Sequence, residues 1–144
     1  MRSAVILLVF LGAPTVVSAQ TPKQVLPIAG ASNPNLSAAV KAGELIFLSG
    51  QLGTGQGGLV PGGIKPEAQQ ALENIKRVVE AAGSSMERIV KCTVFLADIT
   101  EFGSMNEVYR SFWPKEPPAR STVAVAGLVL NGRIEIECIA LAGK

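Results

Sequence analysis

The sequence contains no histidine among its 144 residues. This absence excludes Ser–His and Cys–His nucleophilic pairs, the usual zinc and non-haem iron sites, and acid–base chemistry by imidazole. A catalyst built from this chain must therefore use Arg, Lys, Asp, Glu, Ser, Thr, Cys, backbone groups or the single tyrosine, Tyr109.

The sequence also lacks a concentrated run of basic residues. Its 13 Lys and Arg are scattered and nearly balanced by 11 Asp and Glu, which gives a formal net charge of +2. Proteins that bind nucleic acid through charge usually gather Lys and Arg on one face or in one run. We therefore expect no nucleic-acid partner.

Cofactor and metal signatures are missing as well. The chain has no Cys-x-x-Cys and no glycine-rich phosphate loop that opens a helix. The stretch 53–58 looks superficially like a dinucleotide-binding loop, but its continuation through Pro61, Gly62 and Gly63 favours a flexible loop. We therefore expect neither an organic cofactor nor a bound metal.

The first residues have the order of an export signal. A short basic start precedes an unbroken apolar run over residues 4–11, and Val17-Ser18-Ala19 supplies the small side chains that a signal peptidase needs. The apolar run is far shorter than the roughly 20 residues that cross a bilayer. We therefore expect a signal peptide over residues 1–19 and a mature domain over residues 20–144, periplasmic or secreted and without stable membrane association. The alternative is an uncleaved N-terminal anchor.

Two cysteines, Cys92 and Cys138, lie within strand-like apolar stretches. Export permits a disulfide between them. A buried free cysteine, however, behaves as a small hydrophobic residue, and both positions fit that pattern. We therefore expect two buried thiols and keep a Cys92–Cys138 bridge as the alternative.

Hydrophobic periodicity gives the order of the elements. Residues 66–82 carry apolar side chains at helical spacing, with Pro66 suited to the first turn and Gly83 to the stop. A second amphipathic helix is expected over residues 101–113. Strands are expected over residues 37–41, 45–49, 89–97, 121–128 and 134–141, with a turn at Asn131-Gly132 joining the last two.

This β-β-α-β-α-β-β order predicts one α+β domain, a two-layer sandwich with both helices on one face of the sheet. The opposite face of the sheet then needs cover, and self-association is the simplest source of it. The sequence therefore favours an oligomer over a monomer.

Arg120 and Glu135 are the candidate catalytic residues. Pro117 and Pro118 restrict the backbone ahead of Arg120, whose guanidinium presents a planar fork of donors that fits a carboxylate. Glu135 enters the next expected strand after the Asn131-Gly132 turn, and neighbouring strands can bring the two side chains into one cleft. From the residues alone, a surface Arg–Glu ion pair is favoured over a catalytic pair.

Several stretches of the chain resemble the RidA/YjgF family. The most specific is Pro118-Ala119-Arg120-Ser121, followed at the family's spacing by Ile134-Glu135-Ile136-Glu137. Ser49-Gly50-Gln51 after an apolar strand, the helix end at residues 79–83 and the strand at residues 90–98 are similar to family stretches in the same order. The resemblance covers essentially the whole expected mature domain.

The resemblance implies a chorismate-mutase-like fold of the small trimeric type, a homotrimer with ligand clefts between subunits, and no cofactor. It also implies hydrolysis of enamine and imine acids, such as 2-aminoacrylate, 2-iminopropanoate and 2-iminobutanoate, to 2-oxo acids and ammonia. Arg120 would hold the substrate carboxylate and Glu135 would position or activate water. Ser49 and Asn106 would line the pocket, and backbone groups around Thr122 would contact the imine.

The chain departs from the family pattern at three places. Leu36 stands where deaminase members often have a tyrosine, and Thr122 stands where many members have a cysteine. The segment between Tyr109 and Arg120 is also a few residues shorter than in some members. The alternatives to a deaminase are a non-catalytic trimer that binds small carboxylates or partner proteins, which needs Arg120 but not Glu135, and a ribonuclease, which is less favoured.

Overall fold

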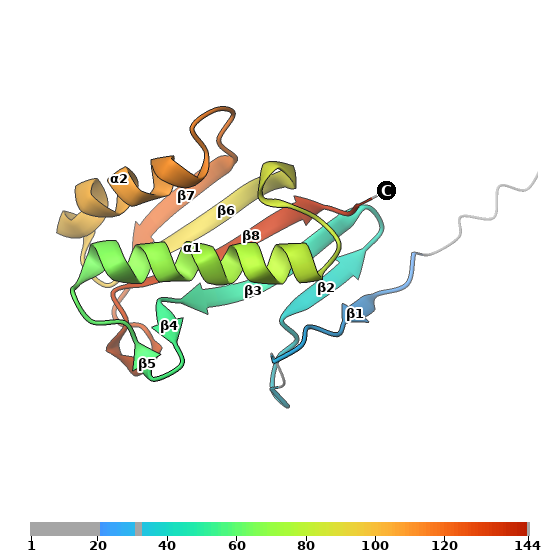
Figure 1. The fold of residues 1–144 in the computed structure, drawn as a ribbon, viewed down its shortest axis with the longest axis horizontal. Helices are drawn as coiled ribbons and strands as arrows, with labels where there is room; N and C mark the ends of the chain where they lie inside the picture. The colour runs from blue at the N-terminus through green and yellow to red at the C-terminus, as the bar shows by residue number, and fades with distance from the viewer. Residues whose placement is uncertain (1–20, 31–32, 144) are drawn as a thin grey trace, which may run out of the picture.

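The computed structural model describes residues 21–30 and 33–143. Six strands form one sheet in the order β1-β2-β3-β8-β6-β7, and two helices cover one of its faces (Figure 1). The expected two-layer α+β sandwich with both helices on one face is therefore confirmed. The expected signal peptide over residues 1–19 lies outside the described residues.

The elements follow one another in the expected order, with short additions. The strands are β1 (Gln24–Leu26), β2 (Ala39–Ala42), β3 (Leu45–Leu52), β4 (Thr54–Gly55), β5 (Gly58–Leu59), β6 (Ile89–Leu96), β7 (Ala119–Ala124) and β8 (Ile134–Leu141). The helices are α1 (Ile64–Ala81) and α2 (Phe102–Phe112), with 3-10 turns at Met86–Arg88, Ile99–Glu101 and Val129–Asn131. Strand β1 and the β4–β5 hairpin were not expected, because two or three residues are too few to show a period.

Helix α1 forms the centre of the helical layer. Its apolar positions repeat at helical spacing and are buried against the sheet: Ile64, Ala68, Ala71, Leu72, Ile75, Val78 and Val79. Gly83 follows the helix with a φ of 80°, a left-handed conformation that glycine adopts without a side-chain clash. The side-chain amide of Asn74 donates hydrogen bonds to the carbonyls of Leu52 and Thr54, which fixes the end of β3 to the helix.

The last two strands are arranged differently from the expectation. Strand β7 pairs in parallel with β6, and β8 lies between β3 and β6, antiparallel to both. The expected hairpin through Asn131-Gly132 is therefore wrong. A turn signal indicates where the chain reverses, but packing across the core decides which strands become neighbours.

The two cysteines form a disulfide, so the expectation of two buried thiols is wrong. Cys92 on β6 and Cys138 on β8 are direct partners in the antiparallel pair, with their Cα atoms 4.1 Å apart. Both residues are buried, as their apolar surroundings indicate. The sequence could not show that they face each other, because the pairing register is a property of the folded sheet.

The sheet face opposite the helices carries apolar side chains that remain exposed. Phe47 is 43% exposed, Val123 45% and Leu141 38%. The residues on either side of Phe47 in β3, Ile46 and Leu48, point to the helix side and are buried. Large apolar patches on a sheet face are typical of interaction surfaces. The fold therefore leaves an uncovered face, as the element order predicts.

Candidate functional site

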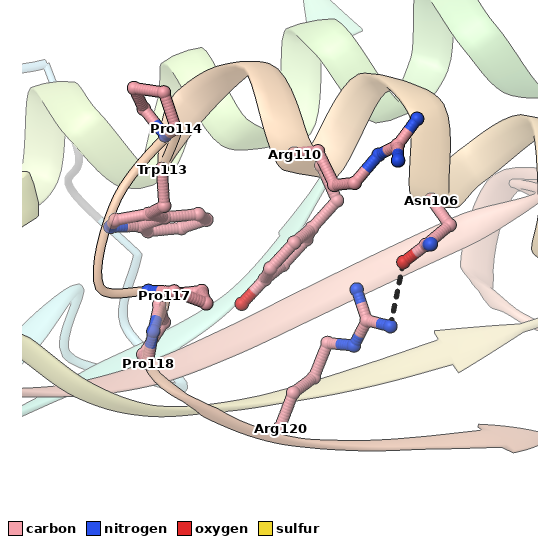
Figure 2. A pocket seen from close by; sticks show the side chains of 8 residues that line it. Asn106, Arg110, Trp113, Pro114, Pro117, Pro118 and Arg120 are labelled. Carbon is pink, nitrogen blue, oxygen red and sulfur yellow. Dashed lines mark hydrogen bonds between the residues drawn. The ribbon is translucent and has the colours of Figure 1, made fainter.

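Arg120 extends from β7 toward helix α2, on the helix-covered side of the sheet. Its Nη2 atom donates a 2.8 Å hydrogen bond to Oδ1 of Asn106 on α2 (Figure 2). Its Cζ atom lies 4.4 Å from the ring centroid of Tyr109 and 5.6 Å from that of Phe102. Cation–π contact and one hydrogen bond thus orient the guanidinium while using one of its five N–H donors.

A pocket of about 550 Å³ opens beside Arg120. Figure 2 shows Arg120 and Asn106 at one end and a wall of Trp113 and three prolines at the other. The full lining is Asn106, Tyr109, Arg110, Trp113, Pro114, Pro117, Pro118 and Arg120. Two of these residues are cationic and none is acidic, so the pocket suits an anion with an apolar part. Among the described residues, no group of three or more Cys, Asp or Glu side chains is placed to hold a metal ion.

Tyr109 also forms part of the pocket wall, although the sequence did not identify it as a site residue. The residue is 3% exposed, and its ring contacts both the Arg120 guanidinium and the ring of Trp113, whose centroid is 4.8 Å away. Burial raises the pKa of its hydroxyl to about 12, although the charge of Arg120 acts in the opposite direction. Its position three residues after Asn106 on the expected helix is the signal that could have placed both on one face.

Thr122 lies on the same side of β7 as Arg120, because alternate residues of a strand share a face. Its Cα partner on β6 is the core residue Val94. The Thr122 hydroxyl is buried and has no hydrogen-bond partner in the described part of the chain. Arg120, Asn106, Tyr109 and Thr122 therefore gather in one place, which we call the α2–β7 half-site.

Glu135 projects from the opposite face of the sheet. Its neighbours Ile134 and Ile136 are fully buried on the helix side, so the side chain between them points away from the helices. Strand β6 also lies between the strands of Arg120 and Glu135. Within the described part of one protomer, Arg120 and Glu135 therefore neither share a cleft nor form the ion pair that the residues alone favour.

Ser49 and Gly50 accompany Glu135. A methyl group on Gly50 would overlap the Glu135 carboxylate, so the glycine makes room for that side chain. The hydroxyl of Ser49 donates a 2.7 Å hydrogen bond to the carbonyl of Ser37. We call Ser49, Gly50 and Glu135 the β3–β8 half-site. Strand β3 lies three strand spacings from β7, roughly 14 Å, so Ser49 does not line the pocket of Arg120.

Leu36, at the position of the family's tyrosine, lies outside the pocket of Arg120 as well. Its side chain is 52% exposed and lines another surface pocket, together with residues 25–29. Of the sequence-predicted site residues, one protomer thus brings together Arg120, Asn106 and Thr122, and it keeps Ser49 and Glu135 apart from them.

The chain matches known proteins over most of its length. The family model described as Ribonuc_L-PSP, Endoribonuclease L-PSP, matches residues 29–142. Protein mmf2, mitochondrial, from Schizosaccharomyces pombe is 49% identical over 105 residues, which cover 71% of this chain and 83% of that protein. The 2-iminobutanoate/2-iminopropanoate deaminase of Bos taurus is 47% identical over 109 residues, or 74% of this chain and 80% of that protein. The crystal structure of E. coli TdcF with bound serine has a TM-score of 0.73 and 39% identity, covering 79% of this chain and 92% of that one.

These comparisons correct the expected location. The Schizosaccharomyces pombe relative is named as mitochondrial. Reactive Intermediate Deaminase A of Arabidopsis thaliana, named as chloroplastic, is 43% identical over 72% of this chain and 57% of that protein. Both names point away from a periplasmic or secreted protein, so that prediction is wrong. It rested only on the residue order near the N-terminus. Within the described ranges, no helix has the length and apolar character needed to cross a membrane.

Proposed function

Because the chain belongs to the RidA/YjgF family, we propose that it hydrolyses 2-iminopropanoate, 2-iminobutanoate and their enamine tautomers, such as 2-aminoacrylate, to 2-oxo acids and ammonia. The observation that carries this proposal is the oriented guanidinium of Arg120 in a pocket without acidic side chains. Relatives named for imine or reactive-intermediate deamination are 47% and 43% identical. The relative TdcF is described with bound serine, which also carries a carboxylate.

Arg120 binds the substrate carboxylate. Asn106 holds one N–H of the guanidinium and the Tyr109 ring supports its plane, which leaves donors for a bidentate contact. The carboxylate of a 2-imino acid is bonded directly to the reacting carbon, C2. Fixing the carboxylate therefore also places C2 for attack. Asn106 lines the pocket beside that position, and backbone groups around Thr122 contact the imine.

Glu135 acts on the attacking water. The carboxylate accepts a proton as the water oxygen bonds to C2, the C=N double bond becomes single and the nitrogen takes up a proton. The hydroxyl of the resulting carbinolamine then gives up its proton as C=O forms. The nitrogen takes up a proton as C–N breaks, so ammonia leaves. One water is consumed and one ammonia is released. Gly50 leaves room for this carboxylate, and the Ser49 hydroxyl beside it is fixed by its hydrogen bond to the Ser37 carbonyl.

Arg120 and Glu135 can act on one substrate only when they come from different protomers, because each protomer places them on opposite sheet faces. We infer a homotrimer in which the α2–β7 half-site of one protomer meets the β3–β8 half-site of the next. Two surfaces are available for this association: the exposed apolar face with Phe47 and Leu141, and β7 at the edge of the sheet. Static light scattering that gave a monomer at micromolar concentration would contradict the trimer.

The activity is tested by ammonia release from freshly generated 2-iminobutanoate and 2-iminopropanoate. Arg120→Lys keeps the charge but loses the fork, so we expect kcat/KM to fall by about ten- to a hundred-fold. Arg120→Ala should lower it further, because the carboxylate then enters the pocket without a counter-charge. Arg77→Ala removes an exposed arginine of helix α1 and is the matched control. Full activity of Arg120→Ala would show that the site is elsewhere.

A further inference from the structure

Tyr109 has a polar group that the proposed mechanism does not use. Its hydroxyl is buried, and the described residues offer it no hydrogen-bond partner. A buried hydroxyl without a partner lowers the stability of a folded protein, whereas phenylalanine would fill nearly the same volume without that penalty. Core packing alone therefore does not explain a tyrosine at this position.

The surroundings of Tyr109 indicate what the partner is. The residue lines the same pocket as Arg120, and its ring lies 4.4 Å from the Arg120 guanidinium carbon. The lining includes two arginines and no acidic side chain, so an anion that enters meets donors rather than competing acceptors. Burial raises the pKa of the phenol to about 12, so the hydroxyl is protonated and can donate at neutral pH.

We propose that the hydroxyl of Tyr109 donates a hydrogen bond to the carboxylate of the ligand that Arg120 holds. A carboxylate has two oxygens, so it can accept one hydrogen bond from the Tyr109 hydroxyl and another from the guanidinium that lies over the same ring. Because the hydroxyl is enclosed in the free protein, the ligand reaches it from the pocket that Tyr109 and Arg120 both line. The inference rests on the proposed function in taking the ligand to be an imino or 2-oxo acid.

Tyr109→Phe tests the inference, because it removes the hydroxyl and keeps the ring under Arg120. We expect the dissociation constant of 2-oxobutanoate, measured by calorimetry, to rise about ten- to a hundred-fold. The KM for 2-iminobutanoate should rise with little change in kcat. The thermal midpoint of the ligand-free protein should stay equal or increase, since an unpaired buried hydroxyl has been removed. Ser111→Ala deletes a hydroxyl from the same helix that bonds the Val108 carbonyl, and it should leave ligand affinity unchanged.

A second readout uses the fact that Tyr109 is the only tyrosine of the chain. Ultraviolet titration of phenol ionisation therefore reports this group alone. Bound 2-oxobutanoate should move the ionisation to higher pH, because an anion that accepts the hydroxyl's hydrogen bond opposes loss of its proton.

The outcomes separate this inference from the proposed function. Unchanged 2-oxobutanoate affinity in Tyr109→Phe overturns the inference. If the variant is also less stable than the wild type, the hydroxyl has a hydrogen-bond partner within the protein instead. If the wild type releases no ammonia from imines but Tyr109→Phe still weakens 2-oxobutanoate binding, the binding role stands and the deaminase proposal fails.

Discussion

The two half-sites differ in chemistry and in how they are built. The α2–β7 half-site contains a guanidinium and an aromatic ring that line a pocket on the helical side. Its two buried hydroxyls, of Tyr109 and Thr122, have no partner among the described residues. The β3–β8 half-site contains a carboxylate that fits against Gly50 on the face without helices. The α2–β7 half-site can bind an anion, and the carboxylate of the β3–β8 half-site can accept a proton from water.

This difference teaches that a single chain carries both groups but does not bring them together. A carboxylate beside Arg120 within one protomer would pair with it and occupy the position of the substrate. Placing Glu135 on the other face avoids that internal ion pair and leaves the guanidinium available to a ligand. In the proposed trimer, each protomer would contribute Arg120 to one site and Glu135 to another.

The largest effect should come from the β3–β8 half-site. Glu135→Gln keeps the shape but cannot accept the proton of water, so we expect kcat for imine hydrolysis to fall by about 10²–10⁴-fold. Calorimetric affinity for 2-oxobutanoate should remain near that of the wild type, because Arg120 is intact. If the variant keeps full turnover, water activation belongs to another group. The role of Arg120 in holding the carboxylate would then be unaffected, and the protein would remain a catalyst.

Mixing two inactive variants tests whether the half-sites meet between protomers. Arg120→Ala protomers retain Glu135, and Glu135→Gln protomers retain Arg120. After unfolding and refolding together in equal amounts, random assembly should restore about a quarter of the wild-type activity, since a quarter of the interfaces join the two intact halves. Each variant refolded by itself is the control. No recovery in verified mixed oligomers would place both residues of one site in the same protomer.

Strand β6 lies between the two half-sites and is joined to β8 by the Cys92–Cys138 disulfide, whose residues are 46 apart in sequence. Replacing both cysteines by alanine should lower the free energy of unfolding by about 2–4 kcal/mol. Urea unfolding with and without a reductant measures this difference. Reductant should destabilise the wild type and leave the double variant unchanged. Equal stability of the two proteins would mean that the bridge does not contribute to the fold.

The smallest effect concerns the one ionisable ring of the α2–β7 half-site. The phenol of Tyr109 has a pKa of about 12 in the folded chain, against 10.0 as the ordinary value. Between these values the unfolded chain loses the proton while the folded chain keeps it. Stability therefore falls as pH rises, by up to about 1.4 kcal/mol per pH unit. Urea midpoints across this range should fall more steeply for the wild type than for Tyr109→Phe, and parallel curves would contradict the buried, protonated phenol.

Much of the fold could be predicted from the sequence because it depends on local patterns. Helix α1 was predicted from its apolar spacing, with Pro66 in its first turn and Gly83 after its end. The failures concern pairing. The hairpin through Asn131-Gly132 and the two free thiols both required knowledge of which strands lie side by side, and strand β8 inserted between β3 and β6 decides both.

The same division holds for the candidate site. The sequence by itself determined which residue types are available, because composition and spacing are properties of the chain. It has no histidine, and it carries Arg120 and Glu135 in a family motif. Only the tertiary structure decided that these residues face opposite sides of the sheet and that Tyr109 supports the guanidinium. The physical reason is that a strand's two faces are distinguished only when one of them is covered, and packing of α1 and α2 makes that choice.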